Sequence, residues 1–231
     1  MATMTFDQIF TAYYSLFRAD SDVPTSTDDE YTVGVRLANE AVNYFADYEG
    51  TYWRELFTTN QLDGTGTQVI TTGTTTYDAP TNFKEAGGFI RVLDTSGNTL
   101  VSYERIEPHE AQFKANGATY AYFTFDLATD THKLHLNPAP TANLNGLDID
   151  YVYYKSPTLF TTGTSTTEMS NPYFIVHRML AMQFRASRNP YYSSALKDSE
   201  NTIRLMQLKN NSGSWDNPPT IPDNSGSTWG W

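Results

Sequence analysis

The chain of 231 residues is long enough to bury a substantial core, in one large domain or two small ones. Its composition, 39% hydrophobic and 18% charged, is that of a globular protein rather than of a disordered one. The absence of cysteine excludes disulfides, thiolate metal ligands and thiol nucleophiles. A net charge of −11 argues against sequence-specific binding of nucleic acid, which usually needs a basic surface.

The first ten residues, MATMTFDQIF, have neither the basic segment nor the apolar core of a secretory signal. No apolar run approaches the ~20 residues that a membrane span requires. We therefore expect a soluble product of the cytoplasm.

The N-terminal part of the chain is expected to form two amphipathic helices. Over residues 5–18 the helical period is carried by Phe6, Ile9, Phe10, Tyr13, Leu16 and Phe17. A polar linker with Pro24 separates this segment from a second helix that opens with a capping box of Thr27 and Glu30. Its inward positions are Tyr31, Val35, Ala38, Ala41, Val42, Phe45 and Tyr48, and an aromatic plug follows at Trp53, Leu56 and Phe57.

From about residue 58 to 168 the sequence is rich in threonine, glycine and asparagine, and turn residues separate short apolar runs. The runs are QVITT, GGFIRVLD, TLVSYERI, TYAYFTFDL, HKLHLNP and LDIDYVYYKS. DTSGNT at 94–99 is typical of a hairpin turn, and EPHEAQFKANG predicts a short helix between strands. Six or seven strands at this spacing predict a small sandwich or a barrel-like sheet.

Helical periodicity returns after residue 169. Asn171 and Pro172 are the expected N-cap and first-turn residues of a third helix, whose apolar positions are Phe174, Ile175, Met179, Met182 and Ala186. A fourth helix, in YYSSALKDSENTIRLMQLKNN, is expected to turn inward Leu196, Ile203 and Met206. Ten of the last 20 residues are Ser, Gly or Pro, which predicts an extended arm.

The predicted fold class is α+β: a four-helix unit interrupted by an antiparallel β-sandwich-like insertion and followed by an extended C-terminal arm. Neither helical half can bury its apolar stripe alone, so we expect residues 1–57 and 169–211 to pack as one domain. Residues 58–168 are the predicted β-rich insertion, and residues 212–231 are the arm.

No catalytic or metal-binding motif is recognisable, and no cofactor is expected. The sequence contains neither a phosphate-binding loop nor a nucleophile elbow. His132 and His135 are expected in one strand, but their spacing of three places them on opposite faces. The other histidines, His109 and His177, are isolated.

Two patterns in the insertion leave functional alternatives open. Asp148 and Asp150 share a predicted strand face, as the paired carboxylates of some hydrolases do, although a solvated strand surface has the same pattern and is the simpler explanation. Tyrosine rings that alternate along strands can stack on carbohydrate or pack within a sheet. Those rings belong to Tyr120, Tyr122, Tyr151 and Tyr153. The main alternative is therefore a binding module whose β domain recognises carbohydrate or another structural protein.

Charge is distributed unevenly along the chain. Residues 172–211 carry a net charge of +4, which leaves −15 on the remainder. Arg178 and Arg185 are seven residues apart in the third predicted helix, and Arg188 follows three residues later. This spacing predicts a basic stripe. The stripe can pair with the acidic second helix of the same chain, or with a neighbouring subunit as in a head-to-tail ring.

The order of these segments resembles the head-to-tail adaptor, or connector, proteins of tailed bacteriophages, in which a β insert interrupts a helical bundle. The resemblance covers nearly the whole chain. It is carried by VRLANEAVNYFADYEGTYWRELF, TTTYDAPTNFKEAGGFIRV, KLHLNPAP, LDIDYVYYKSPTLF and NPYFIVHRMLAMQFRA.

This resemblance implies a structural protein of the virion neck rather than an enzyme. It implies a homo-oligomeric ring, a dodecamer in such families, that binds the portal protein and tail or other neck proteins. The genome would pass through its channel without sequence-specific binding. The candidate contacts with a neighbouring subunit or the portal are Arg178, Arg185, Arg188, Trp215, Ile221, Trp229 and Trp231. A fold-back of the arm onto its own domain is the alternative.

Overall fold

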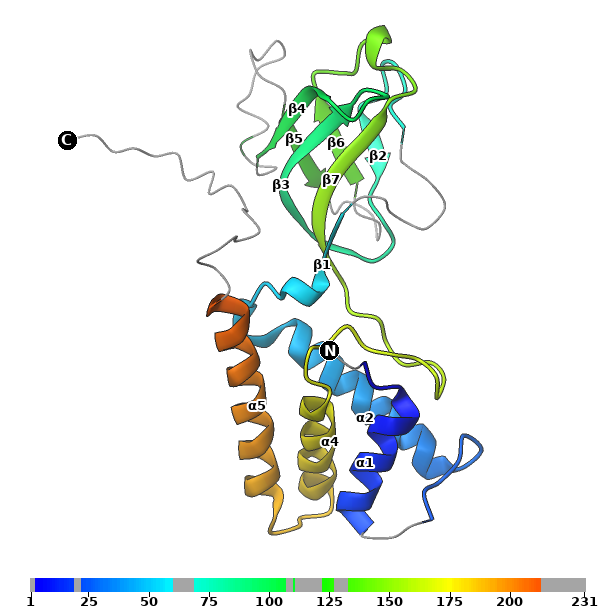
Figure 1. Ribbon diagram of the computed structural model, residues 1–231, viewed down its shortest axis with the longest axis vertical. Helices are drawn as coiled ribbons and strands as arrows, with labels where there is room; N and C mark the ends of the chain where they lie inside the picture. Colours follow the sequence, from blue (N-terminus) through cyan, green and yellow to red (C-terminus); the bar gives the residue numbers. More distant parts are fainter. Residues whose placement is uncertain are drawn as a thin grey trace, which may run out of the picture. The chain divides into compact units, whose positions relative to one another are not determined.

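The computed structural model describes residues 3–18, 22–59, 69–106, 110, 122–126 and 133–212. The described chain divides into two compact units (Figure 1). One unit combines the residues up to Leu56 with those from Ser156 onward, and the other is Phe57–Lys155. Residues 156–168, which the sequence prediction placed in the insertion, therefore belong with the helices.

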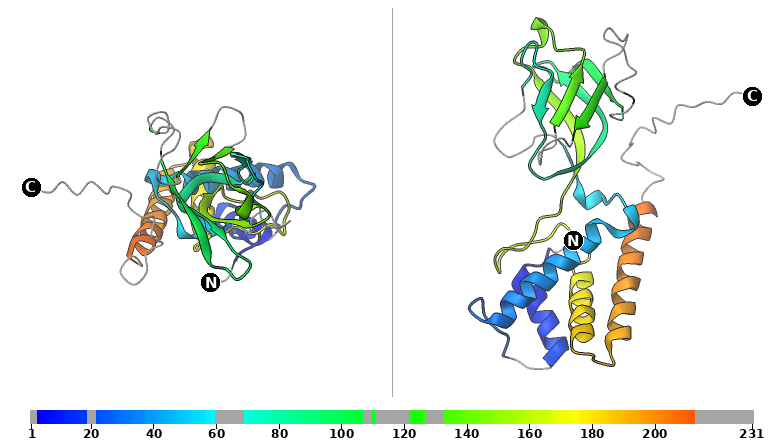
Figure 2. Two further views of the ribbon diagram at one scale, coloured as in Figure 1. Left: turned by 90° about the horizontal axis from the view of Figure 1, so that it is seen from above. Right: turned by 180° about the vertical axis from the view of Figure 1, so that it is seen from behind.

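The helical unit contains, within the described ranges, α1 (Phe6–Arg18), α2 (Asp29–Ala46), α4 (Tyr173–Ala186) and α5 (Tyr192–Ser212). Two short 3-10 turns, Tyr48–Gly50 and Arg54–Leu56, follow α2. Helix α4 packs against all three other helices, and Figure 2 shows it between α5 and α1. The two halves of the chain thus bury their apolar stripes against each other.

Aromatic side chains fill the core of the helical unit. The ring of Phe6 meets that of Tyr31 edge-on at 5.1 Å, and Phe10 lies at the same distance from Tyr31. At the end of α2 the Trp53 indole packs on Phe45, and its Nε1 donates a 2.6 Å hydrogen bond to the Phe45 carbonyl. The predicted aromatic plug is buried at Trp53 and Leu56.

Some details of the helices differ from the sequence prediction. Helix α2 follows Asp28, without a side-chain capping bond, so the predicted capping box of Thr27 and Glu30 is wrong. The Asp28 carboxylate instead accepts hydrogen bonds from the backbone N–H and hydroxyl of Thr25, at 2.7 and 2.9 Å, and closes the preceding turn. Leu16 and Ala186, both expected inward, are exposed.

The second unit contains β1 (Phe57–Thr59), β2 (Thr76–Asp78), β3 (Phe83–Leu93), β4 (Thr99–Arg105), β5 (Tyr122–Asp126), β6 (Lys133–Asn137) and β7 (Asp148–Lys155). These strands form one sheet in the order β1-β7-β3-β4-β5-β6-β2. All neighbouring pairs are antiparallel except β4 and β5, which are parallel. The α+β class and the antiparallel insertion are confirmed.

A single core lies inside this sheet. Its buried residues come from both ends of the strand order, including Tyr77 of β2, Leu134 of β6 and Ile149 of β7. A single sheet that shares one core in this way curls around it, as a partly closed barrel does. The predicted hairpin turn is present between β3 and β4, where Asp94 Oδ1 accepts the N–H groups of Ser96 and Asn98, both at 2.8 Å. The short helix predicted at 107–117 lies almost entirely outside the described residues.

Candidate functional site

Arg178 is engaged within its own subunit. Its side chain is only 18% exposed, and its Nη1 donates a 3.0 Å hydrogen bond to Oε1 of Glu200 on α5. The guanidinium carbon lies 3.8 Å above the ring centroid of Tyr44 on α2, a cation–π distance. The Tyr44 hydroxyl donates to the same Glu200 oxygen at 3.1 Å. One arginine of α4 thereby joins three helices.

The environment of this cluster raises the pKa of the Tyr44 phenol above its ordinary value. Burial makes the largest contribution, and the hydrogen bond to the Glu200 carboxylate adds to it. Tyr44 therefore stays protonated and remains a donor to Glu200. The cluster therefore links α2, α4 and α5 within the helical unit.

The predicted basic stripe is divided between different environments. Arg185 is exposed in the last turn of α4. Arg188 lies beyond the end of that helix, exposed, with a left-handed backbone torsion φ of 52°. The structure gives neither of these two side chains an ion-pair partner among the described residues. Both arginines remain candidates for contact with another protein.

Four of the predicted contact residues, Trp215, Ile221, Trp229 and Trp231, lie outside the described residues. In the part of the helical unit that is described, sequence reasoning missed two exposed leucines on α5. Leu205 is 67% exposed and Leu208 is 59% exposed. Their spacing of three places them together on the side of α5 that faces away from α4. The signal in the sequence was an apolar pair outside the inward stripe of Ile203 and Met206.

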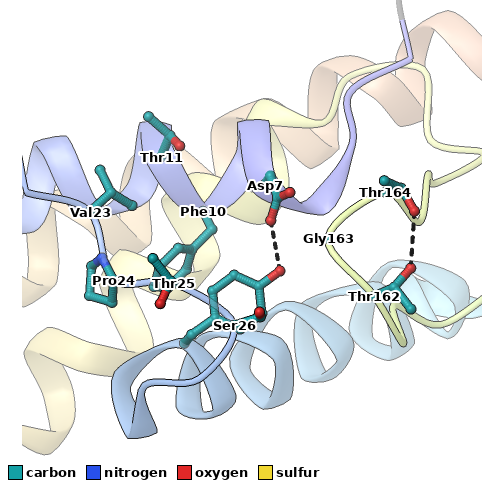
Figure 3. Close-up of a pocket in the computed structure, with 11 residues that line it drawn as sticks. Asp7, Phe10, Thr11, Val23, Pro24, Thr25, Ser26, Thr162, Gly163 and Thr164 are labelled. Atoms are coloured by element: carbon teal, nitrogen blue, oxygen red, sulfur yellow. Dashed lines mark hydrogen bonds between the residues drawn. The ribbon is translucent and has the colours of Figure 1, made fainter.

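A cleft of about 440 Å³ opens between α1, the segment before α2 and the loop at 162–164 (Figure 3). Its lining combines apolar side chains, Phe10, Val23 and Pro24, with the hydroxyl groups of Thr11, Thr25, Ser26, Thr162 and Thr164. The backbone of Gly163 approaches Asp7 so closely that an added Cβ would lie 2.3 Å from the carboxylate. The sequence showed no pattern for this cleft, because its walls come from segments more than 130 residues apart.

The acid at this cleft is already engaged. The Tyr31 hydroxyl donates to Asp7 Oδ1 at 2.7 Å, and burial together with this bond raises the pKa of Tyr31 to about 12. The lining contains no histidine, lysine or arginine that could act as a base or bind an anion. The cleft therefore lacks an acid–base pair.

The chemical alternatives in the β unit find no support in the geometry. Asp150 is ion-paired with Arg91 of the neighbouring strand. Tyr151 and Tyr153 are 2% and 1% exposed, so these rings pack in the core of the sheet and present no surface to a sugar. Tyr120 lies outside the described residues, as does the side chain of Tyr122.

The described residues also give no support for a metal site or a membrane-spanning helix. In the described ranges, histidine and acidic side chains nowhere gather into a set that would hold a metal ion. No helix in those ranges has the length and apolar character needed to cross a bilayer.

These features define a class: an α+β protein in which a curled β unit is inserted into a helical unit. The model of the SU10 adaptor protein family matches residues 4–220, which is nearly the whole chain, and the protein belongs to this family of phage adaptor proteins. The resemblance seen in the sequence is thereby confirmed. The protein is a structural component of a bacteriophage virion. Comparison with curated proteins finds no match.

Proposed function

We propose that the protein is a head-to-tail adaptor that forms a ring in the virion neck, between the portal protein and the tail. The observation that carries this proposal is the family match over residues 4–220, together with a helical unit interrupted by a β unit. In this arrangement the helical unit builds the ring, and the ring offers a platform on which tail or other neck proteins dock.

The charge of the protein supports a passage for DNA. Each copy contributes a net charge of −11, so a ring of copies carries a strongly negative field. A negative surface repels the phosphate backbone and lets the genome slide without binding. We propose that the ring encloses the channel through which DNA leaves the head.

The C-terminal residues are the proposed tether to the portal or to a neighbouring subunit. Prolines at 218, 219 and 222 reduce the conformational entropy that is lost when this segment extends. Trp229 and Trp231 follow as anchors. Burying each indole removes ~200 Å² from water, which at ~25 cal/mol per Å² contributes a few kcal/mol. Repetition around a ring multiplies the effect through avidity.

Electron microscopy of packaged heads assembled with the purified protein tests this function. We expect a symmetric ring of density at one vertex of the head, and none on heads that lack the portal. Decoration over the whole shell, or along the tail, would contradict the proposal. Heads assembled without the adaptor are the matched control and should lose their DNA or fail to accept tails.

A further inference from the structure

We propose that the outer face of α5 on one copy binds the C-terminal residues 213–231 of the neighbouring copy. The inference rests on the proposed function, in which these residues are a tether, and it names the site to which they bind. The α5 outer face is the exposed side of that helix, formed by Lys197, Asn201, Arg204, Leu205 and Leu208. Asp198 and Lys209 lie on its margin, beside Leu205.

The rest of the helical unit packs on the opposite side of α5. Helix α4 covers the side formed by Ala195, Ser199, Ile203 and Met206. Nearer the end of α5, Gln207 and Asn210 donate hydrogen bonds to the segment after α2, at 2.8 and 2.9 Å. Leu205 and Leu208 lie on the other side and are more than half exposed among the described residues. Exposed leucines beside charged side chains are typical of a surface that another chain covers.

The charge of the α5 outer face complements that of the C-terminal residues. Lys197 and Arg204 give the face a charge of +2, and the opposite charges of Asp198 and Lys209 on its margin cancel. Residues 213–231 contain two aspartates and neither lysine nor arginine. The face and the segment therefore attract each other, whereas two α5 outer faces would repel each other.

The spacing of the terminal tryptophans fits that of the leucines. In an extended chain, residues two apart point to the same side and lie about 6.6 Å apart, so Trp229 and Trp231 present their rings together. Leu205 and Leu208, three residues apart on a helix, have Cβ atoms about 5–6 Å apart. Each leucine can thus pack against one indole. Arg204 adjoins Leu205, and a guanidinium over the face of an indole adds a cation–π interaction.

The length of the segment favours the neighbouring copy over the segment's own helix. Trp229 is 16 residues beyond Gly213, which gives a reach between about 22 Å for a flexible chain and about 50 Å for an extended one. Leu208 lies only about 6 Å before the end of its own helix, far inside that reach.

The neighbouring face lies at a better distance. Helix α4 packs between α5 and α1, and packed helices lie about 8–10 Å apart, so the α5 helices of adjacent helical units in a ring are about 30 Å apart. That span matches the reach of the segment, and the effective concentration of a tethered group is highest at such a match. Each copy gives one segment and receives one, so the contact is heterologous and repeats until the ring closes.

Engineered cysteines test the contact, because the chain has none of its own. Two full-length variants, Thr228→Cys and Asn201→Cys, are mixed, assembled on portal-containing heads, treated with a flexible bismaleimide crosslinker and analysed by denaturing electrophoresis. We expect a covalent dimer with one copy of each variant, identified by mass spectrometry, and a ladder of multimers from Thr228→Cys/Asn201→Cys. Thr228→Cys/Asn211→Cys tests the opposite direction of the bound segment. The control is Thr228→Cys/Val33→Cys, because Val33 is 40% exposed but lies on α2.

The outcomes separate this inference from the proposed function. A ring at the vertex with no crosslink between copies from either position would overturn the contact while leaving the adaptor function intact. Crosslinks confined within single chains would assign the face to the chain's own C-terminal residues, and a crosslink to a portal or tail protein would assign the tether to that protein; each result would overturn the inference. The absence of any ring on heads would instead contradict the proposed function.

A double-mutant cycle provides an independent measurement. Leu205→Ser/Leu208→Ser and Trp229→Ala/Trp231→Ala are each expected to reduce the fraction of chain assembled on heads about tenfold, because each removes one side of the same apolar contact. Combining all four changes should cause no further loss, since the contact is already absent. Val33→Ser, on α2, is the matched control and should assemble as the natural chain does.

Losses that multiply to about a hundredfold in the combined variant would show that the leucines and the tryptophans act at separate sites, and would overturn the contact. Helical circular dichroism of the isolated leucine variant should match that of the natural chain, because both leucines are exposed on the surface of α5.

Discussion

Two tyrosines of β7 show how different environments act on the same side chain. Tyr151 and Tyr153 are two residues apart, on one strand face, and both are buried in the core of the β unit. The Tyr153 hydroxyl donates a 2.9 Å hydrogen bond to Asn82 Oδ1. The Tyr151 hydroxyl has no hydrogen-bond partner among the described residues. A buried polar group without a partner costs free energy, so the two hydroxyls have opposite effects on stability.

Removing these two hydroxyls should therefore change stability in opposite directions. Tyr151→Phe is expected to raise the free energy of unfolding by about 1 kcal/mol, because it removes the cost of burying an unpartnered hydroxyl. Tyr153→Phe, the matched control, should lower it by about 1 kcal/mol because a hydrogen bond is lost. Urea unfolding of both variants measures the difference. Equal effects of the same sign would contradict this account.

Two tyrosines of the helical unit are expected to make its stability fall at alkaline pH. Burial is the largest cause that raises the pKa of Tyr13 and of Tyr31 from 10.0 to about 12. Above pH 10 the unfolded chain releases these protons first. Their contribution to stability is therefore complete below pH 10, falls as the pH rises towards 12, and is lost beyond it.

Urea unfolding across this pH range, followed by helical circular dichroism, measures the loss. The decline should be shallower in Tyr13→Phe, which has one fewer titrating group in the core. If the variant and the natural chain decline in parallel, Tyr13 does not contribute to the alkaline transition.

At the scale of the elements, the helical unit depends on a close approach between α1 and α2. A Cβ added to Gly34 of α2 would lie 2.3 Å from the ring of Phe10 on α1. That ring packs edge-on against Tyr31, one turn earlier on α2, and is fully buried. The glycine is therefore a contact surface for the ring rather than a weak point of the helix.

Substitution at this contact should destabilise the protein in spite of a better helix propensity. Gly34→Ala gains about 1 kcal/mol from propensity but incurs about 1–3 kcal/mol of overpacking, so we expect a net loss of about 1 kcal/mol. The free energy of unfolding measures it. In a Phe10→Leu background the same substitution should be less harmful. An identical loss in both backgrounds would show that the ring is not the obstacle.

At the scale of the whole molecule, the β unit is inserted through two adjacent points of the chain. β1 pairs with β7 in a register that sets Phe57 opposite Tyr154, and their rings lie 5.3 Å apart. Residues opposite each other in an antiparallel pair have Cα atoms about 5 Å apart. The chain thus leaves the helical unit and returns to it through neighbouring positions, and a short turn can replace the whole insertion.

This arrangement predicts that the helical unit folds without the insertion. In a variant with Asn-Gly in place of residues 58–153, the two-residue turn joins Phe57 to Tyr154. We expect helical circular dichroism and a single cooperative urea transition. A chain that is unfolded or aggregated would show that the helices need the β unit.

The C-terminal residues are predicted to act in attachment rather than in folding. Deleting residues 213–231, which follow the end of α5, should leave the unfolding transition unchanged but abolish stable binding to portal-containing heads. Co-sedimentation with heads measures binding, and the full-length variant Trp229→Ala/Trp231→Ala tests whether the rings are the anchors. Normal binding of the truncated chain would contradict the proposed tether.

Local patterns in the sequence predicted most of the elements. The helices follow from apolar periodicity, and the β3–β4 turn follows from Asp94 and Gly97, whose side-chain acceptor and left-handed torsion are properties of a few adjacent residues. The sheet order and the parallel pair of β4 and β5 were not predictable, because strand pairing depends on contacts far apart in the chain.

The same limit applies to the candidate surfaces. Arg178 belongs to the same basic pattern as Arg185, and only the position of Glu200, 22 residues away on another helix, shows that it faces inward. Residues 156–168 have no helical pattern, yet Phe160 is buried. Its ring packs 5.4 Å from that of Phe6, and Asn39 of α2 binds both its backbone N–H and its carbonyl. The exposure of Leu205 and Leu208 follows from the packing of α4 on the opposite side of α5, which local sequence does not specify.

The pairing of Phe57 with Tyr154 also determines how the protein responds to mechanical load. A pull transmitted along the chain from Leu56 to Ser156 separates β1 and β7 from their shared end. The hydrogen bonds between these strands then break one after another rather than all at once, which requires little force for each step. The β1–β7 pair can thus open under tension applied along the chain, while β3 still holds the other edge of β7.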